Sequence, residues 1–131
     1  MVKDIAQYIE NQTDLVIGET LFAGFIPSTM TTESCIVVIE SGGSASFYLK
    51  DAMSKTIQVL SRSADYYEAI ANAKIVYDLL HGCAGITLPK VGSDEYYVNA
   101  IEAIAAPQSL GQDEKGLFNI STNFIFRLQC K

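Results

Sequence analysis

The chain contains no tryptophan, one histidine, two arginines and three cysteines among its 131 residues. An odd number of cysteines without short spacings argues against a disulfide framework and against a zinc site. The longest apolar runs, such as residues 36–39, are far shorter than the roughly 18 residues that a membrane-spanning helix needs. Few and scattered basic residues, with a formal net charge of −6, argue against a general phosphate-binding surface.

The histidine and the cysteines give little support for catalysis. His81 lies two residues from Cys83, and a cysteine–histidine pair is a known nucleophile arrangement. Neighbours in a glycine-rich turn are poorly placed for a hydrogen bond between their side chains. We interpret His81 instead as a residue at the end of a helix, where it meets the negative end of the helix dipole.

Two other motifs are also better explained by structural roles than by chemistry. Gly42 and Gly43 lack the lysine spacing and the following helix of a phosphate-binding loop. Asp113 and Glu114 are neighbours, and adjacent carboxylates at the tip of a loop usually form a solvated turn. We therefore predict that the protein is not an enzyme and has no catalytic, cofactor-binding or metal-binding residues.

The apolar fraction of 49% and the charged fraction of 18% are typical of a folded globular protein. The length fits one domain over residues 1–131, large enough to bury a core. The first residues begin no long apolar segment and show no cleavage-site pattern. They predict the absence of a signal peptide and a cytosolic origin.

Residues 63–82 have the clearest helical pattern. Asp65 followed by Glu68 predicts an acidic capping box, and Gly82 predicts a left-handed residue that ends the helix. The expected buried stripe consists of apolar residues spaced by three or four: Tyr66, Ile70, Ala73, Tyr77 and Leu80. A first helix is expected over residues 3–11.

The remaining segments predict strands and turns. Residues 35–40 form a short apolar run rich in β-branched side chains, which predicts a strand buried on both faces near the sheet centre. Residues 14–25 predict a strand pair or one bent strand. Further strands are expected at residues 55–62, 86–88, 95–106 and 118–129, and the last of these alternates most clearly.

Two polar stretches predict flexible connections. Residues 41–54 begin with a glycine- and serine-rich segment and show no clean periodicity, so we expect a long mobile loop that orders against a partner. Residues 107–116 predict a protruding polar loop between two antiparallel strands. The expected fold is α+β, a mostly antiparallel, mixed sheet with two helices packed on one face.

The order of several segments resembles a known family. They are 57–60 and 67–69, the helix end at 77–82, and the hairpin at 110–116 with the strand at 118–124. Together they are similar to the small minor capsid or tail terminator proteins of long-tailed bacteriophages, over most of the chain. The resemblance implies a structural virion protein that assembles in the host cytoplasm.

What the resemblance implies about assembly is specific. Such proteins form a hexameric ring that caps the tail tube, stops its polymerisation and joins it to the head completion or stopper protein. DNA passes through the ring without specific binding, and no membrane is involved. The implied contact residues are Asp113, Glu114 and Lys115 in one loop, and Gly42 and Gly43 in the other.

Two alternatives stay open at this stage. Another head–tail joining protein, a stopper or an adaptor, would share the size, acidity and loops. A small α/β enzyme or ligand-binding domain would need a concave pocket with convergent polar groups. If the ring forms, we expect the net negative charge to be concentrated on its inner wall, where it would repel DNA.

Overall fold

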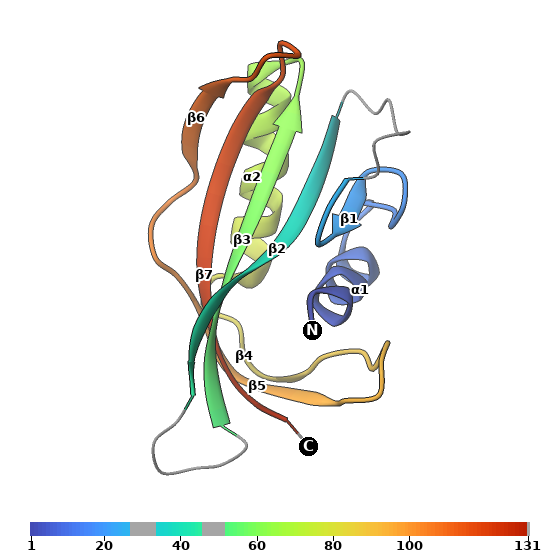
Figure 1. Cartoon of the computed structure of the whole chain (residues 1–131), viewed down its shortest axis with the longest axis vertical. Helices are drawn as coiled ribbons and strands as arrows, with labels where there is room; N and C mark the ends of the chain where they lie inside the picture. The colour runs from blue at the N-terminus through green and yellow to red at the C-terminus, as the bar shows by residue number, and fades with distance from the viewer. Residues whose placement is uncertain (27–33, 46–51, 131) are drawn as a thin grey trace.

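The computed structural model describes residues 1–26, 34–45 and 52–130, which form two helices and one seven-stranded sheet (Figure 1). In chain order the elements are α1 (Val2–Gln12), β1 (Leu21–Ala23), β2 (Ser34–Ala45), β3 (Ala52–Ser63), α2 (Tyr66–Leu80), β4 (Ala84–Thr87), β5 (Tyr96–Ala103), β6 (Gln108–Gln112) and β7 (Phe118–Cys130). The strand order is β1-β2-β3-β7-β5-β4, and β6 also pairs with β7. Among the described strand pairs, β1–β2 alone is parallel, so the predicted α+β fold with a mixed sheet is confirmed.

The main core lies between the two helices and one face of the sheet. Because side chains alternate along a strand, every second residue of β2, β3 and β7 points toward the helices. These strand residues pack with Ile5 and Ile9 of α1 and with Val76 and Leu80 of α2. The strand residues concerned are Ile36, Val38, Ile57, Val59, Phe124, Phe126 and Leu128. Burying each large apolar side chain contributes roughly 1.5–3 kcal/mol.

The described parts of the predicted long loop at residues 41–54, namely 41–45 and 52–54, are strand. β2 continues to Ala45 and β3 begins at Ala52, and the ladder pairs Gly43 with Lys55 and Ala45 with Met53. A register shift follows Glu40, and Gly42 there has a φ of 105°, which favours glycine. Pairing with β3 provides hydrogen-bond partners for the backbone of this polar segment. Composition alone therefore predicted a loop where the chain forms a strand. Residues 46–51 lie outside the described part of the chain.

Helix α2 begins as predicted, but its capping differs in detail. The Asp65 carboxylate accepts a hydrogen bond from the Tyr67 backbone N–H at 3.0 Å, which confirms the N-cap. The predicted capping-box role of Glu68 is wrong. Its carboxylate accepts from the Ser63 hydroxyl at 3.4 Å, and the Ser63 oxygen accepts from the Asp65 N–H at 3.1 Å. The Ser63 hydroxyl thus accepts the hydrogen bond from the N-cap backbone N–H that the capping box assigned to the Glu68 carboxylate.

The buried side of α2 is rotated from the predicted stripe. The buried residues are Ala69, Ala73, Val76 and Leu80. Tyr66 and Ile70 stay 36% and 37% exposed, and Tyr66 lies edge-on to Phe118 with ring centroids 5.5 Å apart. Apolar residues occur on most sides of this helix, so periodicity could not select one face. The two alanines let its backbone lie close to β3 and β7.

The strands differ from the predictions mainly in place and length. β2 is buried on both faces as predicted, with Ile36 on the helix side and Cys35 with Val37 on the other. It is not central, since β3 and β7 lie at the middle of the sheet. Residues 14–25 contribute only the short β1. The predicted loop after Pro107 contains β6, which the sequence analysis missed because all its residues are exposed and Leu110 is its one large apolar residue.

The molecule is elongated, and two hairpins lie at its opposite ends. Figure 1 shows the turn between β6 and β7 at one end of the long axis and the paired ends of β2 and β3 at the other. The two contact segments implied by the family resemblance are therefore far apart in the fold.

Candidate functional site

Asp113 organises the turn between β6 and β7. One carboxylate oxygen accepts from the backbone N–H groups of Lys115 and Leu117 at 2.9 and 3.0 Å. The other accepts from the Arg62 guanidinium at 2.5 Å and from the Asn119 amide at 3.3 Å. The guanidinium, followed by the Leu117 N–H, holds the pKa of this carboxyl well below its usual range. The Asp113 carboxylate therefore stabilises the turn itself.

Glu114 and Lys115 occupy the tip of the same turn and are both exposed. Gly116 follows with a φ of 80°, a left-handed conformation that lets the chain reverse here. Of the three charged residues predicted for this contact, Glu114 and Lys115 are the ones that present their side chains to solvent. The carboxylate of Asp113 instead fixes the shape of the turn that carries them.

Gly42 and Gly43, the other predicted contact residues, lie in β2 at the register shift. Nearby, the Ser41 hydroxyl donates to the Thr56 carbonyl at 2.9 Å, and Lys55 forms an ion pair with Glu40 at 2.6 Å. These contacts hold the hairpin of β2 and β3 together. The two glycines are therefore distant from Asp113, Glu114 and Lys115, and the structure does not bring the two sets together.

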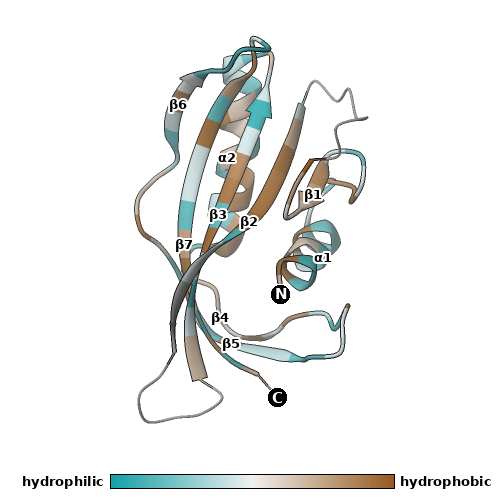
Figure 2. Ribbon diagram, viewed as in Figure 1, coloured by the Kyte–Doolittle hydropathy of each residue, from teal (hydrophilic) through white to brown (hydrophobic). Residues whose placement is uncertain are grey.

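The face of the sheet opposite the helices carries a shallow groove. Its volume is about 380 Å³. Its lining residues are Gly24, Phe25, Ile26, Val37, Ile39, Leu60, Arg62, Asp113 and Asn119. The apolar part continues a second cluster formed by Phe22, Cys35 and Val37. Figure 2 shows the brown, apolar colour of this part of β2. The Arg62–Asp113 ion pair closes the other side of the groove.

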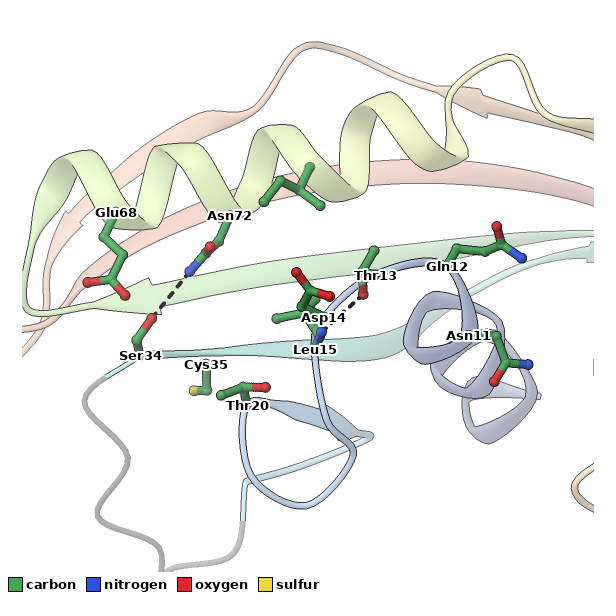
Figure 3. A pocket seen from close by; sticks show the side chains of 11 residues that line it. Asn11, Gln12, Thr13, Asp14, Leu15, Thr20, Ser34, Cys35, Glu68 and Asn72 are labelled. Atoms are coloured by element: carbon green, nitrogen blue, oxygen red, sulfur yellow. Dashed lines mark hydrogen bonds between the residues drawn. The ribbon is translucent and has the colours of Figure 1, made fainter.

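A larger and more polar cleft lies on the helix side, between the end of α1 and the start of α2 (Figure 3). Its volume is about 640 Å³. Asn72 donates to the Ser34 hydroxyl at 3.2 Å across it. Its other lining residues are Asn11, Gln12, Thr13, Asp14, Leu15, Thr20, Cys35, Glu68 and Ile75. Burial raises the pKa of the Cys35 thiol, and no histidine is among these lining residues. This arrangement does not activate a nucleophile.

His81 and Cys83 have separate partners. The Nδ1 atom of His81 accepts a hydrogen bond from the Ala103 backbone N–H at 3.0 Å, and its ring stacks on Tyr77. The Cys83 sulfur lies 3.8 Å from the Tyr8 hydroxyl. Burial, followed by this sulfur, raises the pKa of Tyr8. The two side chains therefore fasten the end of α2 to β5 and to α1 respectively, rather than forming a dyad.

Within the described ranges, no three side chains of histidine, cysteine, aspartate or glutamate are grouped so that they could hold a metal ion. No described helix has the length and apolar character to cross a membrane.

The features that the sequence analysis missed are surfaces: the groove on the sheet face and the uncovered outer side of α2. The groove gave no sequence signal, because its walls come from strands distant in the chain. The helix did give one, since only four of its 15 residues are polar or charged, namely Glu68, Asn72, Lys74 and Asp78.

Comparison with known proteins identifies the family. A family model described as bacteriophage tail terminator protein matches residues 8–130, nearly the whole chain. The chain therefore belongs to the bacteriophage tail terminator family, and it is a structural protein of the virion tail. This confirms the resemblance inferred from the sequence.

A solved structure supports the same fold. The chain is similar to one in the virion of a native gene transfer agent (GTA) particle, with a TM-score of 0.65 and 15% sequence identity. The match covers 96% of this chain and 93% of that chain. At this identity, the likeness establishes the fold alone. A search of curated protein sequences gave no match.

Proposed function

We propose that this protein forms a hexameric ring that caps the tail tube, stops its polymerisation and joins it to the head completion or stopper protein. The role is structural rather than enzymatic. DNA passes through the ring without specific binding, and assembly takes place in the host cytoplasm. Membership in the tail terminator family supports this proposal.

The observation that carries the proposal is the placement of two hairpins at opposite ends of the long axis (Figure 1). A ring between tube and head has two outer faces, and each must contact a different partner. The turn with Glu114 and Lys115 supplies the contact at one face. The β2–β3 hairpin with Gly42 and Gly43 supplies the contact at the other.

The internal bonding of the turn also supports a contact role. Asp113 fixes it through four hydrogen bonds, so Glu114 and Lys115 are presented on a preorganised backbone. Preorganisation reduces the ordering cost of association. The net charge of −6 fits an acidic inner wall that repels DNA, although the wall itself exists only in the ring.

The direct test is a polymerisation assay with the purified tail tube protein. Added to growing tubes, the wild-type protein should stop elongation, and electron microscopy should show a six-fold ring at one tube end. A stopper or adaptor would leave tube length unchanged and would bind the portal side instead. Unlimited tube growth without end binding would refute the proposal.

The turn can be tested in the same assay. The double variant E114A/K115A should fold normally and cap tubes less well, or lose binding to the head completion protein. Lys74→Ala removes an exposed charge on α2, an element that is part of neither hairpin, and should not affect these axial contacts. If E114A/K115A retains both activities, the assignment of the turn is wrong.

A further inference from the structure

Hydrogen bonds of two kinds join the segment that follows α2 to β5. In the first kind both groups belong to the backbone: the Gly82 N–H donates to the Ile101 carbonyl at 3.0 Å, and the Ile101 N–H donates to the Cys83 carbonyl at 2.8 Å. In the second kind the Ala103 N–H donates to the Nδ1 atom of His81 at 3.0 Å. A side chain therefore takes the place of a backbone acceptor at one position of this junction.

The position of Ala103 explains why a side chain serves as the acceptor there. Backbone N–H groups point alternately to the two sides of an antiparallel strand. The Ile104 N–H donates to the Asn123 carbonyl of β7 at 2.8 Å, so the Ala103 N–H points to the other side, toward β4. The ladder between β4 and β5 covers residues 97–100 of β5 and ends before Ala103. His81 thus supplies the acceptor that the ladder lacks at this edge.

The backbone and a neighbouring ring hold the imidazole in this place. His81 is the C-cap of α2, with φ and ψ of −64° and 125°, and Gly82 follows with a φ of 81° and turns the chain toward β4. The imidazole stacks on the Tyr77 ring, with centroids 5.1 Å apart and an angle of 15° between the ring planes. A nitrogen that accepts a hydrogen bond carries no proton, so the neutral ring bears its proton on Nε2.

A protonated imidazole cannot accept this hydrogen bond. Both of its nitrogens are donors, so protonation sets the Nδ1–H group against the Ala103 N–H. We infer that His81 is a pH-sensitive switch between α2 and β5, bonded to β5 when its ring is neutral and released when its ring is charged. His81 is the single histidine of the chain, and histidine is the side chain whose charge ordinarily changes between about pH 5 and 8.

The charges at the junction give the released ring a second partner. The ionisable groups there are Tyr77 and Asp78 of α2, Cys83 with its Tyr8 partner from α1, and Glu102 of β5 with its Arg127 partner from β7. The charge of Glu102 is offset by Arg127, at 3.8 Å. Asp78 and the carbonyl groups at the end of α2 attract a positive ring. The neutral ring therefore favours β5, and the charged ring favours the end of the helix.

Amide hydrogen exchange at Ala103 tests the switch in the protein in solution, independently of the proposed ring. Protection is measured by NMR at pH 8 and pH 5 and corrected for the intrinsic exchange rate at each pH. In the wild type, protection of Ala103 should fall about 2- to 10-fold in acid, the factor that corresponds to the loss of one hydrogen bond.

Two variants bracket the two states of the switch. His81→Asn keeps an acceptor oxygen at the position of Nδ1 but has no group that titrates in this range, so protection of Ala103 should be high at both pH values. His81→Phe keeps the stacked ring without an acceptor, so protection should be low at both. His81 is exposed, so both variants should fold, which circular dichroism would verify.

The Ile101 amide is the internal reference. It points to the same side of β5 as the Ala103 amide, but its acceptor is the Cys83 carbonyl, which does not titrate. Its protection should be the same at both pH values. Unchanged protection of Ala103 in the wild type, or an equal loss in His81→Asn, would overturn the inference. An equal loss at Ala103 and Ile101 would also overturn it, because acid would then loosen the whole junction rather than the imidazole bond.

Discussion

The guanidinium of Arg62 and the carboxylate of Asp113 lie 2.5 Å apart and join the end of β3 to the turn between β6 and β7. The same carboxylate caps two backbone N–H groups of that turn. One ion pair therefore links the centre of the sheet to the segment that we propose as a partner contact. It also closes one side of the groove on the sheet face.

Replacing Asp113 by asparagine should lower the free energy of unfolding at pH 7. The native pKa of Asp113 is depressed, chiefly by Arg62, so its stabilising contribution is present above the unfolded-state pKa of about 3.9. As the pH falls below about 4, that contribution is progressively lost. Urea unfolding would measure the free energy of unfolding of both proteins at pH 7 and pH 3. The difference between wild type and D113N should be smaller at pH 3.

Glu102→Gln is the control for this titration. Glu102 is 3.8 Å from Arg127 in an exposed pair, and such pairs contribute little to stability. Its effect at pH 7 should be smaller than that of D113N. If the difference in free energy of unfolding between wild type and D113N is the same at pH 7 and pH 3, the assigned role of the carboxylate is contradicted.

Thr122→Val should stabilise the protein by about 1–2 kcal/mol. The Thr122 side chain is buried in β7, and its hydroxyl oxygen has no hydrogen-bond partner among the described residues. Valine has nearly the same shape and removes an unsatisfied polar atom, whose burial costs about 1–3 kcal/mol. Chemical denaturation would measure the gain.

Ser61→Ala is the opposite case on the neighbouring strand. The buried Ser61 hydroxyl donates to the Ala69 carbonyl of α2 at 2.8 Å. Removing it should destabilise the protein by about 1 kcal/mol. If Thr122→Val and Ser61→Ala lowered the free energy of unfolding equally, the Thr122 hydroxyl would have a hydrogen-bond partner, contrary to this prediction.

Gly82→Ala should destabilise the protein by about 1–2 kcal/mol. Gly82 follows α2 with a φ of 81°, and a Cβ there strains the backbone without meeting any neighbouring atom. Gly92→Ala also places a Cβ in open space, but its φ lies outside the left-handed range. That control should be neutral or slightly stabilising, and thermal unfolding would compare the two.

Two phenylalanines should differ strongly in their contribution to stability. Phe124 is fully buried between the helices and the sheet, so Phe124→Ala should cost about 3–5 kcal/mol. Phe25 is 70% exposed, and Phe25→Ala should change stability by less than about 0.5 kcal/mol. A large loss of stability in Phe25→Ala would mean that Phe25 packs in the core rather than lying on the surface.

Much of the fold could be predicted because local patterns were strong. The alternation of β7 placed Phe124, Phe126 and Leu128 on one face, and the structure confirms their burial there. Asp65 marked the start of α2, and Gly82 marked its end. These features depend on neighbouring residues alone, so the sequence carries them directly.

Other features depended on contacts between distant residues. Residues 41–45 look like a loop, yet they pair with β3, because a neighbouring strand satisfies their backbone. The buried side of α2 was mispredicted for a related reason. Its composition is apolar on most sides, and only packing on β3 and β7 selected Ala69, Ala73, Val76 and Leu80.

The sequence by itself determined the class of this protein: a small acidic α+β domain, similar to tail terminators, without a recognisable catalytic motif. The tertiary structure decided where its surfaces lie. It turned Asp113 inward to Arg62, left Glu114 and Lys115 outside, and formed a groove from strands far apart in the chain. Periodicity reports which residues are apolar, but a surface exists only once separate segments have been brought side by side.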